Sequence, residues 1–448
     1  MALLNDTTNL PKALGDGLIL RRATPADTAT VAALNARILA EENEPPQVFE
    51  AWTRDLMSGR HPTNTAADFI VVENTRTAQI VSSACLIPQV WKYEHISFGV
   101  GRPELVVTDP AYRRRGLVRA IFEALHALST AQGHLAQGIT GIPWFYRQFG
   151  YEYALPLMGM RTLNLSDVPT LKEGETEPFQ VRPAAEADIP ALLPLYQRQC
   201  AGKLVTTHID EARWRYDLTG HSPNSLAGIR VFCVCDQTGT VIGYFSTGLL
   251  PWQGRVTVWE VITAAGVSLR AVLPSVTRAL KTQAESFSSS PGGQNVTGLR
   301  FALGEAHPFY EAFDAKLGPS QQPYAWYVRV ADVPGFVHHI APILERRLAD
   351  SVMSGYSGEL KMSFYQGGLR LGFERGRLSE AAGWQPPDSD HSWDGAGFPP
   401  LVFLQLLFGY RSLSELRYAF PDCWVDEEPA LLLNALFPKR VSLVFPLG

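Results

Sequence analysis

Three consecutive arginines followed by a glycine are the residues whose types and spacing point most directly to chemistry. They lie in the stretch VVTDPAYRRRGLVRAIFEAL, where an apolar strand-like run leads into an apolar-periodic helix. A glycine-containing turn before a helix presents unpaired backbone N–H groups and the positive end of the helix dipole. Arg113, Arg114 and Arg115 add charge, and Gly116 lets an anion approach the backbone closely. The pattern predicts a phosphate or pyrophosphate site, with a solvated basic turn as the alternative.

Two other phosphate-binding signatures are absent from the sequence. There is no GxxxxGK[ST] motif and no GxGxxG motif, so a P-loop and a Rossmann dinucleotide site are both excluded. The arginine turn must therefore belong to a different class of anion site.

Composition excludes several classes of protein. The chain has 448 residues, enough for two or three domains, and its net charge of -5 argues against general nucleic-acid binding. The five cysteines have no zinc spacing, and the adjacent His338 and His339 point apart on a helix or strand, so we expect no metal. The longest apolar stretch, PPLVFLQLLFGY, is too short to span a bilayer, and the first residues lack a signal-peptide pattern. We expect a cytoplasmic protein that binds neither membrane nor nucleic acid.

An internal repeat organises the chain. LRRATPADTATVAALN from Leu20 is echoed by VRPAAEADIPALLPLY from Val181, and FYRQFGY is echoed later by FYEAFDA. Each copy then reaches the tripeptide DVP, and the polar stretch TLKEGETEPFQ lies between the copies. Matches in the same order at a nearly constant offset predict two homologous domains.

The expected elements alternate between strands and helices. In the first copy, we expect strands at 18–23, 68–74, 79–88, 96–108 and 135–140, and helices at 25–40, 47–58 and 116–132. The second copy has similar strands at 230–235 and 240–249. After residue 330, alternating apolar residues and then helical runs at 399–409, 412–419 and 428–436 indicate a third, α+β domain. The predicted fold class is mixed α/β, with domains at 1–165, 177–330 and 331–448.

The arginine stretch resembles the acyl-coenzyme A binding motif of the GCN5-related N-acetyltransferases, which has an R-x-x-G-x-G/A turn. Here Val118 occupies the position of the second small residue, and the variant RRRGL-x-R is similar to that of the Eis-like acetyltransferases. FYRQFGY resembles their IYGRFGY segment. The resemblance implies a GNAT acetyltransferase domain, a degenerate GNAT-like copy, and a C-terminal domain like sterol carrier protein 2. It also implies acetyl-CoA as co-substrate and a hexameric homo-oligomer.

The resemblance also implies which residues bind the co-substrate. Backbone groups of the strand before the turn should contact the pantetheine arm, the turn should surround the pyrophosphate, and the loop after the next strand should contact the cofactor again. These residues are Val106, Val107, Thr108, Arg114, Arg115, Gly116, Leu117, Val118, Arg119, Gly141 and Ile142. The second copy lacks the arginine cluster, so we expect one active site per chain.

Acetyl transfer from a thioester to an amine needs a proton for the leaving thiolate. Tyr146 matches the family's catalytic tyrosine and is the expected general acid; its alternative is a core aromatic. We expect no histidine or acid of the first domain at a base position beside it. The resemblance implies instead that the terminal carboxylate of Gly448 is the general base, with a purely structural C-terminal strand as the alternative.

Acidic residues after the first helix suggest the acceptor. Glu41, Glu42 and Glu44 are either a solvated face or an acidic lip that attracts a cationic primary amine, such as an aminoglycoside or a polyamine. Protein lysine acetylation is an alternative activity. A non-catalytic lipid or coenzyme A binding scaffold is the alternative from another class.

Overall fold

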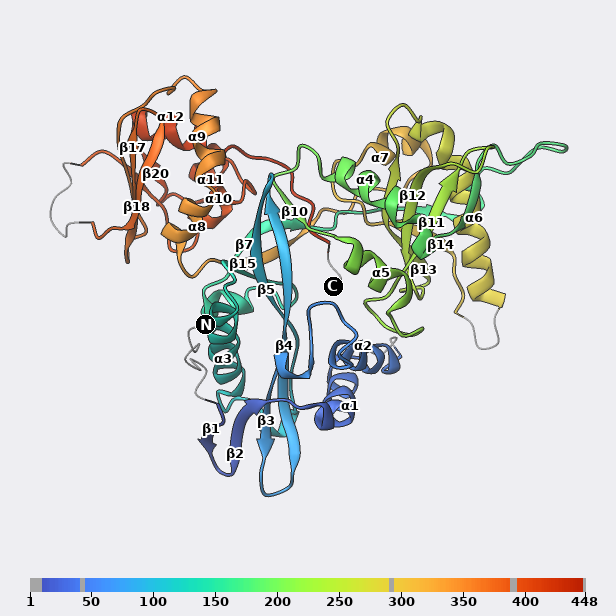
Figure 1. Ribbon diagram of the computed structural model, residues 1–448, viewed down its shortest axis with the longest axis horizontal. Coiled ribbons are helices and arrows are strands. Elements are labelled where there is room, and N and C mark those ends of the chain that lie inside the picture. Colours follow the sequence, from blue (N-terminus) through green and yellow to red (C-terminus); the bar gives the residue numbers. More distant parts are fainter. Residues whose placement is uncertain (1–9, 41–44, 290–293, 387–392, 446–448) are drawn as a thin grey trace.

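Three sheets with flanking helices make up the protein in a computed structural model, which describes residues 10–40, 45–289, 294–386 and 393–445 (Figure 1). The structure thus has the mixed α/β class expected from the sequence. Within those ranges, no helix is both long and apolar enough to cross a membrane.

The elements follow the predicted order closely. The first copy contains β1 (Lys12–Gly15), β2 (Leu18–Arg22), α1 (Thr28–Leu39), α2 (Gln47–Met57), β3 (Phe69–Asn74), β4 (Gln79–Tyr93), β5 (Ile96–Thr108), α3 (Leu117–Ala131), β6 (Ala136–Ile139) and β7 (Glu152–Leu157). The middle of the chain contains β8 (Arg161–Asn164), β9 (Gln180–Pro183), α4 (Ile189–Cys200), β10 (Val205–Thr207), α5 (Glu211–Thr219), β11 (Ile229–Cys235), β12 (Val241–Gly248), β13 (Arg255–Thr263), α6 (Leu269–Ser289), β14 (Gly298–Phe301), α7 (Pro308–Phe313) and β15 (Tyr324–Arg329). The last part contains α8 (Val333–His339), α9 (Ala341–Ala349), β16 (Gly358–Ser363), β17 (Gly368–Glu374), β18 (Arg377–Gly383), β19 (Ala396–Gly397), α10 (Phe403–Leu407), α11 (Leu413–Ala419), β20 (Trp424–Val425) and α12 (Glu427–Leu436).

Strand β4 runs five residues further than the sequence predicts, to Tyr93, and passes through Pro88. His208 N–H donates to Val90 O on one edge of β4, so Pro88, two residues earlier, directs its nitrogen to that same edge. No strand pairs with that edge at Pro88, so the missing N–H costs no ladder hydrogen bond.

The first sheet has the order β1-β2-β3-β4-β5-β6-β15-β7, and β10 pairs with the far end of β4. Helices α1 and α2 cover one face and α3 covers the other (Figure 1). Alternation along β4 divides its side chains between the two cores, because Cys85 and Ile87 pack under α1 and α2 whereas Ala84 and Leu86 pack under α3.

The second sheet repeats this plan, with the order β8-β14-β13-β12-β11-β9. Its parallel pair is β13 and β14, as β5 and β6 are the parallel pair of the first sheet. The repeated sequence also folds alike locally: Arg21 bonds both carboxylate oxygens of Asp27 at 2.8 Å, and Arg182 bonds both oxygens of Asp188 at 2.7 Å.

The two sheets exchange strands across the repeat. Strand β15, at the end of the second copy in sequence, lies in the first sheet between β6 and β7. Strand β8, at the end of the first copy, pairs with β14 at the edge of the second sheet. Neither sheet is therefore built from one continuous stretch of chain.

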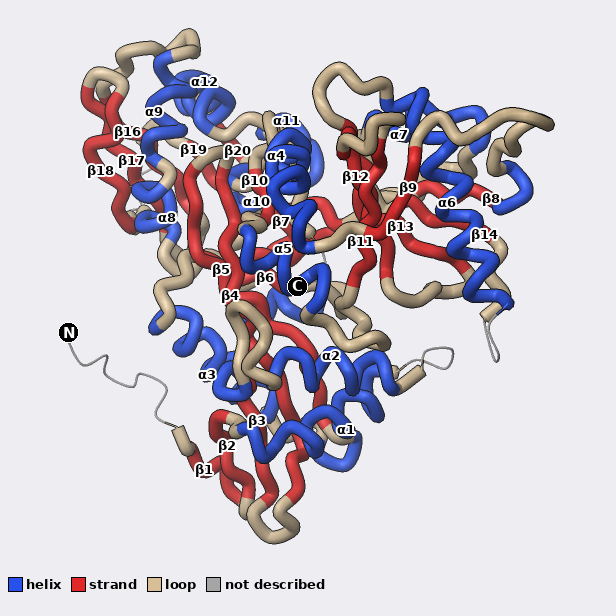
Figure 2. The backbone as a smooth tube through the Cα atoms, turned by 45° about the vertical axis from the view of Figure 1, so that its right-hand side comes forward, coloured by secondary structure: helices blue, strands red, loops and turns tan. Residues whose placement is uncertain are grey.

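The last sheet, β18-β17-β16-β19-β20, packs with helices α8 to α12. Its core is continuous with the far end of the first sheet, where Tyr93 Oη donates to Leu407 O at 2.8 Å. The predicted helix at 399–409 is limited to α10 and adjoining turns, since the pair Pro399–Pro400 precedes it and Gly409 (φ 60°) follows it. After α12, residues 441–445 run along β10 and reach Phe445 between the first and second sheets (Figure 2).

Candidate active site

The first sheet opens beside strand β5. Strands β5 and β6 pair in parallel only at Val100–Ala136 and Gly101–Gln137, after which they separate. Asp109 N–H donates to Val81 O on β4, and alternate residues of a strand face opposite neighbours. The backbone groups of Thr108 therefore face the open side, where no strand pairs with them.

A β-bulge shapes β5 just before this end. Cys85 on β4 pairs with Glu104 and Ser83 pairs with Val107, so Leu105 and Val106 together oppose Ala84. Leu105 has φ 52°. Bulges re-aim side chains, and here Val106 packs on the α3 side of the sheet while Leu105 packs on the α1 side.

The arginine turn lies between β5 and α3 and is left-handed at two residues, Arg114 (φ 60°) and Gly116 (φ 75°). The N–H groups of residues 114–119 donate to no atom in the described part of the chain, and a Cβ added to Gly116 would meet nothing within 4 Å. A row of free N–H groups at the start of a helix of 15 residues is an anion site by geometry and by dipole. A solvated basic turn would account for the arginine side chains, but it would not account for these free amides.

The arginine side chains differ in their contacts. Arg114 has no hydrogen bond or ion pair to a described residue, so its guanidinium is available. Arg115 pairs with Asp16 at 2.7 Å and stacks on Tyr112, and Arg119 bonds Gln148 Oε1 at 3.3 Å. All three are close to the helix start.

Three tyrosine hydroxyls hold the loop that carries Gly141 and Ile142. Tyr324 Oη donates to Gly141 O and Tyr327 Oη donates to Ile142 O, both at 3.3 Å. Tyr153 Oη accepts from Trp144 N and is bonded to both other hydroxyls. Tyr324 and Tyr327 belong to β15, so a strand from much later in the chain positions this loop. Ile142 itself is 56% exposed.

Tyr146 lies in a short 3-10 helix and its ring is buried among Phe122, Tyr151 and Tyr327. Its hydroxyl makes no hydrogen bond to a described residue and is not sealed in the core, so it is free to meet a ligand. Burial raises the pKa of this hydroxyl, and the nearby Glu104 carboxylate adds to the rise, so it stays protonated at neutral pH. Val106 from β5 and Val118 from α3 pack against the same aromatic cluster, which brings Tyr146 to the opening.

Glu104 is an acid of the first copy whose charge acts on Tyr146. Its carboxylate adds to the rise in the pKa of Tyr146, and its side chain is 18% exposed. Arg102 holds one oxygen at 2.6 Å, and Leu105 N–H donates to the other at 3.3 Å. The signal available in the sequence was an acid inside an apolar strand, repeated as Glu260 in the second copy.

The other expected residues fall in two groups. His126 bonds Tyr151 Oη at 2.9 Å and His134 bonds Ser129 Oγ at 3.1 Å, so both serve the core beneath α3. Glu41, Glu42, Glu44 and Gly448 lie outside the described residues. The described residues contain no group of three or more His, Cys, Asp or Glu side chains that could hold a metal ion.

The second copy has lost the free tyrosine hydroxyl and the arginine cluster of the first. At the start of α6, Ser268 O and Oγ accept from Ala271 N–H, and Ser268 O also accepts from Val272 N–H. Tyr310, the counterpart of Tyr146, donates to Phe301 O at 2.7 Å and accepts from Leu303 N–H at 3.2 Å. The hydroxyl of the corresponding tyrosine is thus occupied by the protein itself.

Comparison with known proteins agrees with this geometry. Residues 20–154 match the family model described as an acetyltransferase (GNAT) domain. The first copy is a GNAT acetyltransferase domain. Acetyl-CoA is the acyl donor of such domains, and the free amides of the arginine turn fit its pyrophosphate. No curated protein sequence matches the chain well enough to refine this assignment.

The whole chain shares its fold with solved GNAT structures. A GCN5-related N-acetyltransferase from Kribbella flavida is 18% identical with a TM-score of 0.61, over 96% of this chain and 99% of that one. One from Anabaena variabilis is 12% identical with a TM-score of 0.62, over 96% and 99%. Eis1 from Mycobacterium abscessus is 12% identical with a TM-score of 0.57, over 95% and 98%. The likeness to Eis extends beyond the GNAT domain to the arrangement of all three parts.

Proposed function

We propose that the protein is an acetyl-CoA-dependent N-acetyltransferase that acetylates a primary amine of a cationic small molecule, such as an aminoglycoside or a polyamine. The observation that carries the proposal is the row of unpaired amides at residues 114–119, beside an opened strand and a tyrosine whose hydroxyl is free. Neither the free amides nor the free hydroxyl contributes to folding. Together they supply an anion-binding site and a proton donor.

Residues of the chain would bind the acyl donor and supply a proton to its leaving group. The amides of residues 114–119 and the guanidiniums of Arg114, Arg115 and Arg119 would hold the pyrophosphate, and Thr108 would offer backbone groups to the pantetheine arm. Acetyl-CoA supplies a thioester, whose C–S bond breaks as the amide C–N bond forms. Tyr146 would give its proton to the leaving sulfur, whose pKa as a free thiol is about 8.5.

Two carboxylates are candidates for the base that takes the proton from the amine. The charge of Glu104 acts on the pKa of Tyr146, and its side chain is partly open to solvent. The terminal carboxylate of Gly448 is supported by the path of the chain, because residues 441–445 run beside β10, the neighbour of β4. A carboxylate near the opening would also attract a cationic acceptor, as would Glu41, Glu42 and Glu44 after α1.

The last part of the chain is proposed to be like sterol carrier protein 2 and to serve architecture. Glu94 at the end of β4 supports this role, because it is bonded by Arg347 at 2.6 Å, by Arg440 at 2.5 Å and by Arg346. Burial acts to raise the pKa of Glu94, but these three guanidiniums outweigh burial and lower it. The carboxylate therefore fastens the C-terminal part to the first sheet.

An acceptor screen tests the proposal. Free thiol release from acetyl-CoA would be measured with aminoglycosides, polyamines, arylamines and lysine peptides, with the Tyr146→Phe variant as the inactive control. Turnover of aminoglycosides or polyamines supports the proposal, and turnover confined to lysine peptides supports protein acetylation instead. Failure to bind acetyl-CoA in isothermal titration would favour a non-catalytic scaffold.

A further inference from the structure

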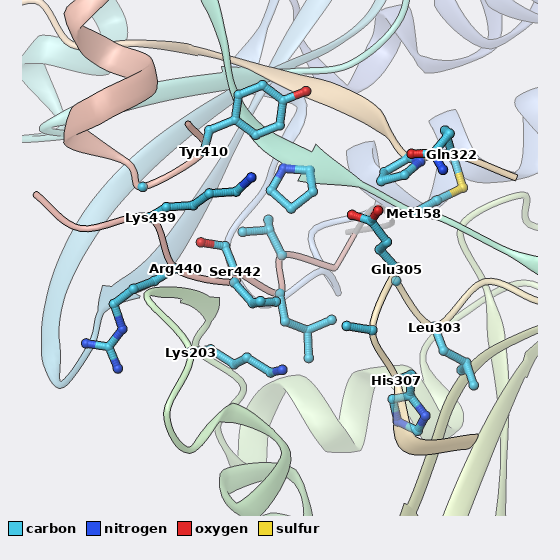
Figure 3. A pocket seen from close by; sticks show the side chains of 18 of the residues that line it. Met158, Lys203, Leu303, Glu305, His307, Gln322, Tyr410, Lys439, Arg440 and Ser442 are labelled. Carbon is cyan, nitrogen blue, oxygen red and sulfur yellow. The ribbon is translucent and has the colours of Figure 1, made fainter. Parts of the chain in front are cut away.

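A second cavity, of about 810 Å³, lies away from the arginine turn, between the second sheet and the C-terminal part of the chain (Figure 3). Its walls come from α4, the end of β13, residues 302–307, the loop around Tyr410, and residues 439–445. None of the residues between Glu104 and Tyr146 lines it. The volume is in the range of small-molecule sites.

The cavity occupies the second copy's equivalent of the active site. Strands β13 and β14 pair in parallel up to Val258–Phe301 and then separate. Glu260 on one strand and residues 302–307 after the other both line the cavity. The opening between parallel strands has therefore been retained in the second copy, although the turn before its helix has no arginine cluster and Ser268 accepts from Ala271 N–H.

A cation facing this cavity lacks a partner. The Lys203 ammonium makes no hydrogen bond or ion pair among the described residues, and it points into the cavity toward the side where His307 lies (Figure 3). Trp259 and Gln199 also line the cavity, but their polar atoms Trp259 Nε1 and Gln199 Oε1 are closed off from solvent. A partly buried ammonium without a partner favours an anionic ligand at this point.

His307 adds a further donor. Its Nδ1 accepts a hydrogen bond from Phe309 N–H at 3.1 Å, which leaves the ring proton on Nε2. Burial, together with the charge of Lys203, lowers the pKa of His307 to about 4, so the ring is neutral at pH 7. Lys203 and His307 therefore offer one ammonium and one N–H donor to the same cavity.

Glu260, the buried acid of the cavity, does not require a bound cation. Both oxygens of Glu260 are bonded, by Tyr244 Oη at 3.2 Å and by Ser246 Oγ at 3.0 Å, and burial raises the pKa of Glu260 to about 7. Glu305 also lines the cavity, but this residue is exposed to solvent. Between these groups the walls are apolar, from residues such as Met158 and Leu303.

We propose that this cavity binds an organic acid with an apolar body, its carboxylate held by Lys203 and His307 and its hydrocarbon or aromatic part against the apolar walls. The site is separate from acetyl transfer and does not depend on the function proposed above. Because Leu443 and Val444 form part of the wall, the bound acid also contacts the segment that leads to the end of the chain.

Isothermal titration of the full chain tests the proposal with three probes: octanoate, butyrate and octylammonium. Octanoate is expected to bind, and butyrate more weakly by about fourfold for each methylene that it lacks. Lys203→Met is expected to weaken octanoate binding by about tenfold or more, because a charge-assisted hydrogen bond is lost. Lys203→Arg, the matched control, should retain binding within about threefold, since it keeps the charge.

Two further measurements keep the test independent of folding. Trp259→Phe removes a ring N–H that is closed off from the cavity and keeps an aromatic ring in the wall, so it should leave octanoate binding within about threefold. Octanoate should also slow amide hydrogen exchange in residues 441–445. Octylammonium binding as tightly as octanoate, equal octanoate binding by Lys203→Met, or no octanoate binding at millimolar concentration would each overturn the proposal.

Discussion

The ring of Tyr146 is packed edge-on against the ring of Tyr327, with centroids 5.5 Å apart and an interplanar angle of 76°. Tyr327 lies on β15, which ends the second copy in sequence yet completes the first sheet. The same residue holds the loop after β6 through Ile142 O. The candidate acid and the candidate cofactor loop thus both depend on a strand from the other half of the repeat.

Removing the Tyr327 ring should affect activity and stability together. Tyr327→Ala is expected to lower stability by about 3 kcal/mol or more, because a fully buried aromatic ring is lost, and to lower kcat because Tyr146 loses its support. Tyr327→Phe keeps the ring and should retain kcat within about threefold. Thermal unfolding and steady-state kinetics measure both effects; equal kcat in the alanine variant would contradict this dependence.

The hydroxyl of Tyr146 should matter for turnover and not for cofactor affinity. Tyr146→Phe is expected to lower kcat by roughly 10²-fold, the typical contribution of a general acid, with the Kd for acetyl-CoA unchanged. Tyr310→Phe is the matched control in the second copy. It should leave kcat unchanged and lower the melting temperature, because the Tyr310 hydroxyl bonds backbone atoms. Similar kcat values for the two variants would contradict the assignment.

The free guanidinium of Arg114 should act on the acyl donor alone. Arg114→Gln is expected to raise the Kd for acetyl-CoA by about tenfold without changing stability, since Arg114 has no partner in the described part of the chain. Arg270→Gln, in the first turn of α6, is the corresponding change in the second copy and should have no effect on acetyl-CoA binding. An Arg114 variant with unchanged affinity would favour the solvated basic turn.

The two candidate bases can be separated by matched variants. If Glu104 is the base, Glu104→Gln should lower kcat by roughly 10²-fold, and deletion of the last residues should leave kcat near its original value. If the Gly448 carboxylate is the base, a short C-terminal tag should abolish turnover while acetyl-CoA still binds. Measuring kcat and Kd for each variant decides between them. A folded, truncated protein with full turnover would exclude Gly448.

Stability should fall as the pH is lowered below about 6.5. Burial, with a smaller contribution from Arg329, lowers the pKa of His126 to about 3 in the folded protein, against about 6.5 in an unfolded chain. Between these values the unfolded state binds the extra proton, so the contribution is complete above pH 6.5 and declines toward pH 3. His126→Gln should flatten the dependence of melting temperature on pH between 6.5 and 4.5. His95→Gln, at an exposed position, should not flatten this dependence. Identical pH profiles of melting temperature for the original protein and both variants would contradict this linkage.

Local sequence determined the elements and the anion-binding turn. The arginine–glycine turn before α3 could be recognised because its features are contained in a few adjacent residues: Gly116 permits the left-handed turn, and the helix that follows supplies free amides. The repeat was equally visible, because an arginine and an aspartate six residues later recur and form the same ion pair in both copies.

The tertiary structure decided what the sequence could not. That the charge of Glu104 acts on Tyr146 depends on a β-bulge and on the separation of β5 from β6, and neither leaves a local signal. That β15 completes the first sheet is a choice among exposed strand edges, and strand pairing over long sequence distances is set by the packing of whole layers, not by neighbouring residues. The sequence alone thus determined which groups are available for chemistry, and the fold decided which of them meet, because distance in space is fixed only when the sheets close.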